Sequence, residues 1–151
     1  MDDNENTANN TGKETQEILE ELERAWEVDF QANEAGKPAL EKLNTVDSVY
    51  GKLLKRKNQQ ELLDSGVLSS LKKWLEPLPD KSLPHEDVKK SVFEILLHLT
   101  PEVEHLQESG IGKIVLFYSK NPYEKKPIKR LARQLILKWI EIATEEESGV
   151  H

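Results

Sequence analysis

Apolar residues recur along most of the chain at the three- and four-residue spacing of an amphipathic helix. No stretch shows the strict two-residue alternation that is typical of a half-buried β-strand. The pattern predicts an all-α fold: a compact right-handed bundle of about seven or eight helices, with hairpins stacked as in HEAT and armadillo arrays. The stripe expected for the central helix comprises Val88, Val92, Phe93, Ile95, Leu96, Leu97 and Leu99.

The same periodicity divides the chain into four segments. Residues 1–13 are polar and acidic without an apolar anchor, and we expect them to be disordered. Residues 14–36 are expected to form an amphipathic helix that docks on the body, although its apolar stripe would also suit a partner protein. Residues 38–143 are expected to form the helical core domain, and the polar residues 144–151 a frayed tail.

Prolines and glycines indicate where helices begin and end. Gly36 suits the end of the N-terminal helix, since glycine commonly follows the last helical residue. Pro38 is expected in the first turn of the second helix, and Pro101 in the first turn of a later helix with Thr100 as its N-cap.

A proline-rich segment after Trp74 interrupts the helical pattern. Each proline fixes its own φ and lacks a backbone donor, so no helix passes through this segment. Two leucines flank its polar turn, which favours a corner held on the core, although a plain connector would share the composition. The residues expected to form this structural corner are Leu78, Pro79, Leu83 and Pro84.

The helix expected from Gly112 to Lys120 carries apolar residues on two sides. Its inner face comprises Ile111, Ile114, Val115 and Tyr118. Lys113, Phe117 and Lys120 fall on the opposite face, with Leu116 beside them. Either another segment, such as the N-terminal helix, covers Phe117, or this face is a surface pocket for an acidic, aromatic peptide.

The composition narrows the function. The chain has 151 residues, a formal net charge of −7 and no cysteine. Disulfides, thiolate metal sites and cysteine nucleophiles are therefore excluded. Without a signal peptide or a long apolar run, we expect a soluble intracellular protein that does not enter a membrane.

Positive charge gathers towards the C-terminal end. The cations in this region are Lys113, Lys120, Lys125, Lys126, Lys129, Arg130, Arg133 and Lys138. A nucleic-acid- or phosphate-binding module that uses the basic final helix is therefore an alternative function. Since the chain as a whole is acidic, such binding to DNA would be weak or absent and strongly salt-dependent.

The residues do not suggest catalysis. None of the four histidines has the spacing of a metal motif, and the acidic pairs are typical of solvated helix faces. The two glycines around Ile111 lack the preceding strand of a phosphate-binding loop. We expect neither enzyme activity nor a cofactor.

Three motifs resemble one family. They are WLEPLPDKSLP at residues 74–84, HLQESGIGK at 105–113 and LARQLILKW at 131–139. Together they resemble the core of the eukaryotic Iws/Spn elongation factors, which are named for interacting with SPT-six. The last motif also resembles the N-terminal (LW) domain of elongation factor S-II. One departure is Lys81, where the family usually has glycine, so we expect a turn that does not need a glycine-only conformation.

The resemblance implies a non-catalytic nuclear factor that acts with RNA polymerase II during transcription elongation. It implies that the helical domain binds an aromatic, acidic peptide of SPT-six, a histone chaperone, and that histones or nucleosomes are contacted through other regions. Chromatin and mRNA processing belong to the same implied role. The resemblance places Lys113 and Phe117 in the peptide groove. The neighbours expected to line the groove with them are Leu116, Lys120, Leu68 and Leu71.

Overall fold

The structure, a computed structural model, describes residues 3–147, which form eight α-helices and no strand. The helices are α1 (Asp3–Glu34), α2 (Glu41–Leu53), α3 (Arg56–Asp64), α4 (Val67–Leu75), α5 (Glu86–His98), α6 (Val103–Ser109), α7 (Ile111–Lys120) and α8 (Lys126–Glu147). Among the described residues, no helix has the length and apolar character needed to cross a membrane.

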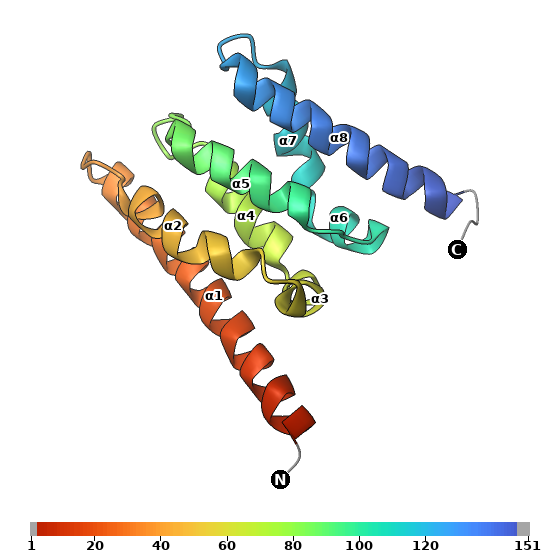
Figure 1. Ribbon diagram of the computed structural model, residues 1–151. Coiled ribbons are helices and arrows are strands. Elements are labelled where there is room, and N and C mark those ends of the chain that lie inside the picture. The colour runs from red at the N-terminus through yellow and green to blue at the C-terminus, as the bar shows by residue number, and fades with distance from the viewer. Residues whose placement is uncertain (1–2, 148–151) are drawn as a thin grey trace.

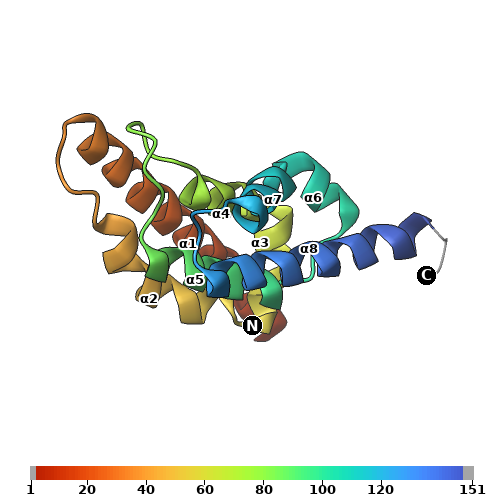
Figure 2. The same ribbon diagram turned by 90° about the horizontal axis from the view of Figure 1, so that it is seen from above.

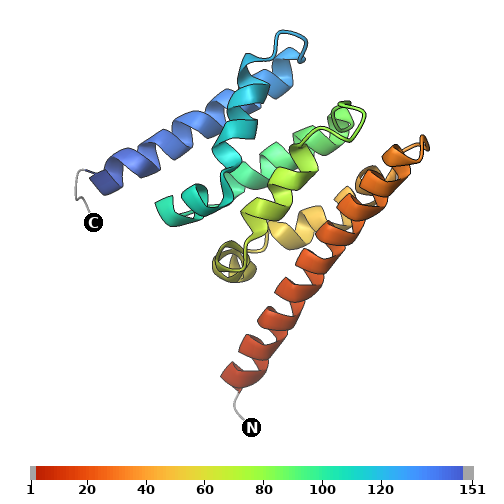
Figure 3. The same ribbon diagram turned by 180° about the vertical axis from the view of Figure 1, so that it is seen from behind.

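The long helices lie in two layers. Helices α2, α5 and α8 face the viewer in Figure 1, and α1, α4 and α7 face the viewer from the opposite side in Figure 3. Consecutive members pack as the hairpins α1–α2, α4–α5 and α7–α8, while α3 and α6 lie in the connections between hairpins. The expectation of an all-α fold of stacked helical hairpins is confirmed.

Both ends of the chain are more helical than expected. Helix α1 begins at Asp3, which corrects the expectation of disorder through residue 13. The segment contains no proline, and its acidic composition suits the positive end of a helix dipole. Helix α8 continues through Glu147, beyond the expected end at residue 143. The remainder of the expected tail, residues 148–151, lies outside the described residues. Figure 2 shows the C-terminal part of α8 extending beyond the other helices.

The start of α2 is set by a side chain of α1. Asp29 is buried, and its two carboxylate oxygens accept the backbone N–H groups of Glu41 and Lys42 at 2.7 and 2.9 Å. These are donors that a helix N-terminus leaves without an internal partner. Pro38 therefore lies in the preceding loop, not in the first turn as expected.

The start of α6 also differs from the expectation. Its N-cap is Glu102, whose side chain and that of His105 form a reciprocal capping box. Two bonded groups satisfy more free N–H donors than Thr100 alone could. Pro101 is consequently a buried residue of the connection.

The proline corner is fastened to α1 by hydrogen bonds. The Asp80 carboxylate accepts the backbone N–H and the hydroxyl of Ser82, and Asn33 of α1 accepts the Asp80 N–H at 3.0 Å. Lys81 has a φ of 73°, so lysine here adopts the conformation that glycine adopts most easily. The expectation that this turn avoids such a conformation is wrong.

The apolar residues of the corner contribute unequally. Pro84 is buried and Leu83 is half-buried against the core. Leu78 is also half-buried, whereas Pro79 is exposed. The C-terminal part of the corner, Leu83 and Pro84, therefore contributes most of the contact with the core. That Leu78 also anchors the corner remains a proposal.

The Asp29 cap predicts a specific loss of stability. Asp29→Ala removes both acceptors and leaves two N–H groups at the start of α2 without a partner. We expect the free energy of unfolding to fall by about 2 kcal/mol in urea denaturation. Asp47→Ala, on the exposed face of the same helix, is the matched control and should change it by less than about 0.5 kcal/mol. Equal effects of the two substitutions would contradict the capping role.

Candidate functional site

Helix α7 begins at a sharp turn that the sequence encodes directly. Gly110 has a φ of 65°, and it is both the C-cap of α6 and the N-cap of α7. The hydroxyl of the buried Ser109 accepts the Ile111 N–H at 3.2 Å. The turn lets α7 leave α6 at an angle and pack on α8.

Tyr118 anchors α7 on the preceding hairpin. Its hydroxyl donates a 2.6 Å hydrogen bond to the carbonyl of Leu75, the last residue of α4. That carbonyl has no partner within its own helix, because the residue four positions later is Pro79. The fully buried Tyr118 ring also meets Phe93 of α5 edge to face, with 5.5 Å between ring centroids.

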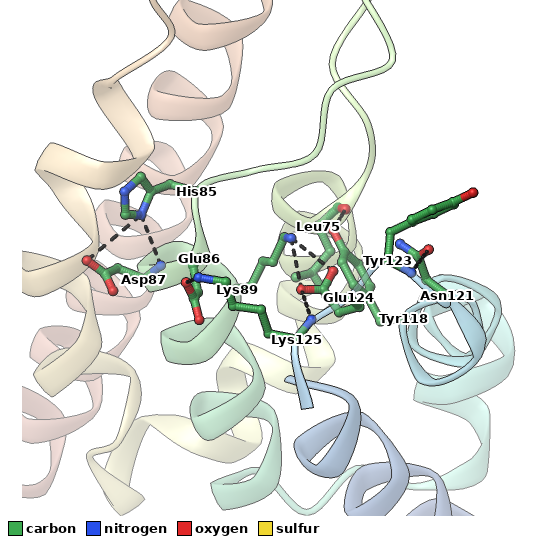
Figure 4. A network of polar contacts seen from close by, with 10 residues as sticks. All are labelled: Leu75, His85, Glu86, Asp87, Lys89, Tyr118, Asn121, Tyr123, Glu124 and Lys125. Atoms are coloured by element: carbon green, nitrogen blue, oxygen red, sulfur yellow. Dashed lines mark hydrogen bonds and ion pairs between the residues drawn. The ribbon is translucent and has the colours of Figure 1, made fainter. Parts of the chain in front are cut away.

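A buried ion pair fixes the loop that follows α7. The Lys89 ammonium lies 2.9 Å from the Glu124 carboxylate and 5.5 Å from the centroid of the Tyr118 ring. Figure 4 shows these groups gathered between α5 and the loop before α8. Burial, and secondarily the Glu124 charge, raise the pKa of Tyr118 far above its ordinary value, so its hydroxyl remains a donor at neutral pH.

The outward face of α7 is open. Leu116 and Phe117 are 43% and 42% exposed, and Lys113 and Lys120 beside them are exposed. Helix α1 packs on α2, α3 and α4, at the opposite edge of the molecule in Figure 1. The alternative that the N-terminal helix buries Phe117 is therefore wrong.

An apolar groove continues this face onto α8. Its volume is about 300 Å³, and its walls come from α6, α7 and α8. The lining residues are Leu106, Gly112, Leu116, Ile136, Trp139, Ile140 and Ala143. Trp139 is buried, and its indole N–H has no hydrogen-bond partner among the described residues. Buried donors are nearly always satisfied, so this N–H is an exception among the described residues.

Most groove residues were missed from the sequence, because the final helix was interpreted as having a single inner face. The available signal was the width of its stripe: Ile140 and Leu137 are apolar but 55% and 64% exposed. We call the outward face of α7 together with this groove the α7–α8 surface.

Two expected groove residues belong to the core instead. Leu68 is 2% exposed and Leu71 is fully buried within α4. Their stripe on α4 faces the other helices, so neither lies on the open face of α7. Leu68 and Leu71 remain candidates only for supporting the groove from the interior of the protein.

The expected basic face is partly engaged in structure. The Lys138 ammonium donates 2.6 Å bonds to the carbonyls of Leu97 and Leu99 at the end of α5, and burial lowers the pKa of Lys138. Lys125 pairs with Glu86. The remaining exposed cations near α7 and along α8 are Lys113, Lys120, Lys126, Arg130 and Arg133.

No group of three or more histidine, aspartate or glutamate side chains among the described residues could hold a metal ion.

Three comparisons identify relatives of this architecture. A family model, Med26, described as a TFIIS helical bundle-like domain, matches residues 94–143. Protein IWS1 homolog 2 of Arabidopsis thaliana is 40% identical over 139 residues, 88% of this chain. Transcription factor SPN1 of Saccharomyces cerevisiae is 41% identical over 101 residues. The crystal structure of a Spt6-Iws1(Spn1) complex from Encephalitozoon cuniculi matches with a TM-score of 0.86 and 35% identity, over 89% of this chain and 98% of that one.

The chain belongs to the Iws1/Spn1 family of transcription factors.

Iws1/Spn1 relatives in the curated set are considerably longer than this chain. The chain spans 34% of the Arabidopsis protein and 25% of the Saccharomyces protein. It therefore corresponds to one segment of these longer proteins, and the resemblance expected from the three sequence motifs is confirmed.

The Tyr118 anchor predicts a measurable loss of stability. Tyr118→Phe keeps the ring contacts and leaves the Leu75 carbonyl without its hydrogen bond. The free energy of unfolding should fall by about 1–2 kcal/mol in urea denaturation. Tyr123→Phe is the matched control, because Tyr123 is 94% exposed and points away from the network in Figure 4. A Tyr118→Phe protein as stable as the control would show that the anchor is dispensable.

Proposed function

We propose that this helical domain is the partner-binding part of a nuclear transcription elongation factor, and that its α7–α8 surface binds a short segment of Spt6 (SPT-six). The observation that carries the proposal is an apolar surface framed by cations on a domain whose structural relative was solved in a Spt6-Iws1(Spn1) complex. The role is one of binding, without catalysis.

The chemistry of the surface defines the segment that it would accept. Phe117 and Leu116 offer apolar contact area, and the adjoining groove accepts an aromatic or aliphatic side chain. Lys113 and Lys120 lie on either side of Phe117 and attract acidic residues. The buried, unsatisfied Trp139 N–H would donate to a peptide carbonyl once neighbouring side chains move aside. An acidic segment with an apolar anchor fits all three features.

The wider role is proposed on the family alone. Binding of Spt6, a histone chaperone, would couple this domain to elongating RNA polymerase II. Histones or nucleosomes would be contacted through other regions of the longer family members. Nuclear localisation follows from the same role.

A second candidate function is weak binding of nucleic acid or phosphate through the exposed cations of α8. Arg130 and Arg133 are exposed and lack an ion pair among the described residues. The net charge of −7 opposes such binding. Peptide binding is therefore the better supported function.

Phe117→Glu is expected to abolish binding of an Spt6 peptide with the protein still folded. The substitution places a carboxylate where an apolar anchor should sit, and truncating such anchors weakens binding by about 2 kcal/mol or more, roughly thirtyfold. Calorimetric titration measures the affinity, and circular dichroism checks the helical content. Intact binding by the folded variant would refute the assignment of the surface.

Gly112→Met provides an independent block of the groove. A Cβ at Gly112 meets nothing within 4 Å, so a side chain extends into open space without disturbing the fold. Replacing a helical glycine should also stabilise α7, by less than the roughly 1 kcal/mol typical of a helix interior because Gly112 lies in the first turn. We expect a more stable protein with weaker peptide binding. Ser70→Met, on half-buried α4 surface outside the groove, is the control for added bulk.

Replacing both exposed arginines separates the two candidate functions. Arg130→Ala with Arg133→Ala should slow association of the peptide and reduce its salt dependence, and should leave its dissociation rate within about twofold, as for charges at an interface rim. Stopped-flow association at two salt concentrations measures this. A large rise in dissociation rate would place both arginines inside the binding site.

A further inference from the structure

A second pocket, of about 490 Å³, lies where the α1–α2 turn meets the proline corner and the start of α5. None of its lining residues belongs to α7 or α8, so it is separate from the α7–α8 surface. Its apolar walls come from Leu43, Leu78, Leu83 and Val88. Its volume lies in the range of small-molecule sites.

One wall of this pocket contains a buried cation. Lys42 is 3% exposed, and its ammonium makes no hydrogen bond or ion pair with any residue that the structure describes. It is the second residue of α2, at the end of the helix dipole that disfavours cations. Burial lowers the pKa of Lys42, and the electrostatic attraction of Asp29 offsets this only in part.

The acids of the pocket are already engaged. Both oxygens of Asp29 accept backbone N–H groups at the start of α2. The Asp80 carboxylate accepts the backbone N–H and hydroxyl of Ser82. Neither carboxylate forms an ion pair with Lys42, so the ammonium is available to an anion that enters the pocket.

The other ionisable side chains of the lining, His85 and Lys37, add no anion. His85 uses Nδ1 to accept the Asp87 N–H, so its neutral ring carries its proton on Nε2. Lys37 is exposed and adds a second cation at the mouth of the pocket. The lining therefore combines two lysines that lack ion pairs with apolar walls, and both of its carboxylates are engaged in other hydrogen bonds.

We propose that this pocket binds a small free carboxylate that carries an apolar group, with the carboxylate held by the Lys42 ammonium. The nearby Asp29 and Asp80 charges disfavour a doubly charged phosphate more strongly than a singly charged carboxylate. The leucine and valine walls accept a short hydrocarbon chain. This inference is independent of the proposed Spt6 binding.

The first test concerns the free protein. If Lys42 serves a ligand, Lys42→Met removes a charge that is largely buried and has no ion-pair partner, and it fills the same space. The melting temperature should then rise by roughly 2–4 °C. Lys90→Met replaces an exposed lysine on α5 and should leave it unchanged. A fall in melting temperature for Lys42→Met would overturn the proposal, because Lys42 would then be a structural partner of Asp29.

The second test uses the native chain and 4-methylpentanoate as the probe. The side-chain ¹³C–¹H signal of Lys42 should shift saturably with the probe, while those of the exposed lysines do not. Inorganic phosphate and chloride at the same ionic strength are the comparison anions. The probe should also raise the melting temperature of the native protein and not of Lys42→Met. A Lys42 signal that does not saturate, or that shifts equally with phosphate or chloride, would overturn the proposal.

Discussion

The hydrogen bond from the Tyr118 hydroxyl to the Leu75 carbonyl determines which side of α7 faces outwards. The bond exists because the prolines after α4 leave that carbonyl without a helical partner, and Tyr118 is the only group that the structure shows donating to it. With Tyr118 turned inwards and Lys89 paired to Glu124 beside it, helical geometry turns Phe117 outwards. The proline corner and the exposed face of α7 are thus parts of one arrangement.

Two polar side chains that the fold leaves without a partner line the surfaces that we assign to binding. Most buried polar groups in the described chain find partners, often across helices, as Asp29 and Lys138 do. The Trp139 N–H has no partner, the Lys42 ammonium has no ion pair, and each residue lines a cavity. The buried side-chain oxygens of Thr15 and Asn58 also lack partners and line neither cavity. Burying a polar group without a partner lowers stability. At Trp139 and Lys42, the proposed binding roles are therefore obtained at some cost in stability.

The sequence predicts the fold well because the apolar stripes are strong and the turns carry glycine and proline. It also predicts the outward position of Phe117, since Tyr118 and its neighbours complete the inner face. It fails where the deciding contact comes from another helix. The start of α2 depends on Asp29, which is distant in sequence, and Leu68 and Leu71 could not be placed beneath the surface by spacing alone. The groove required knowing how α8 crosses α7.

The most direct measurement of where a partner binds is a map of backbone amide chemical shifts in the folded chain during titration with an acidic, aromatic Spt6 peptide. Binding at the α7–α8 surface should perturb residues 106–120 and the second half of α8, and should leave α1, α2 and the proline corner unchanged. Perturbations confined to α1, α2 or the corner, with α7 unaffected, would contradict the assignment.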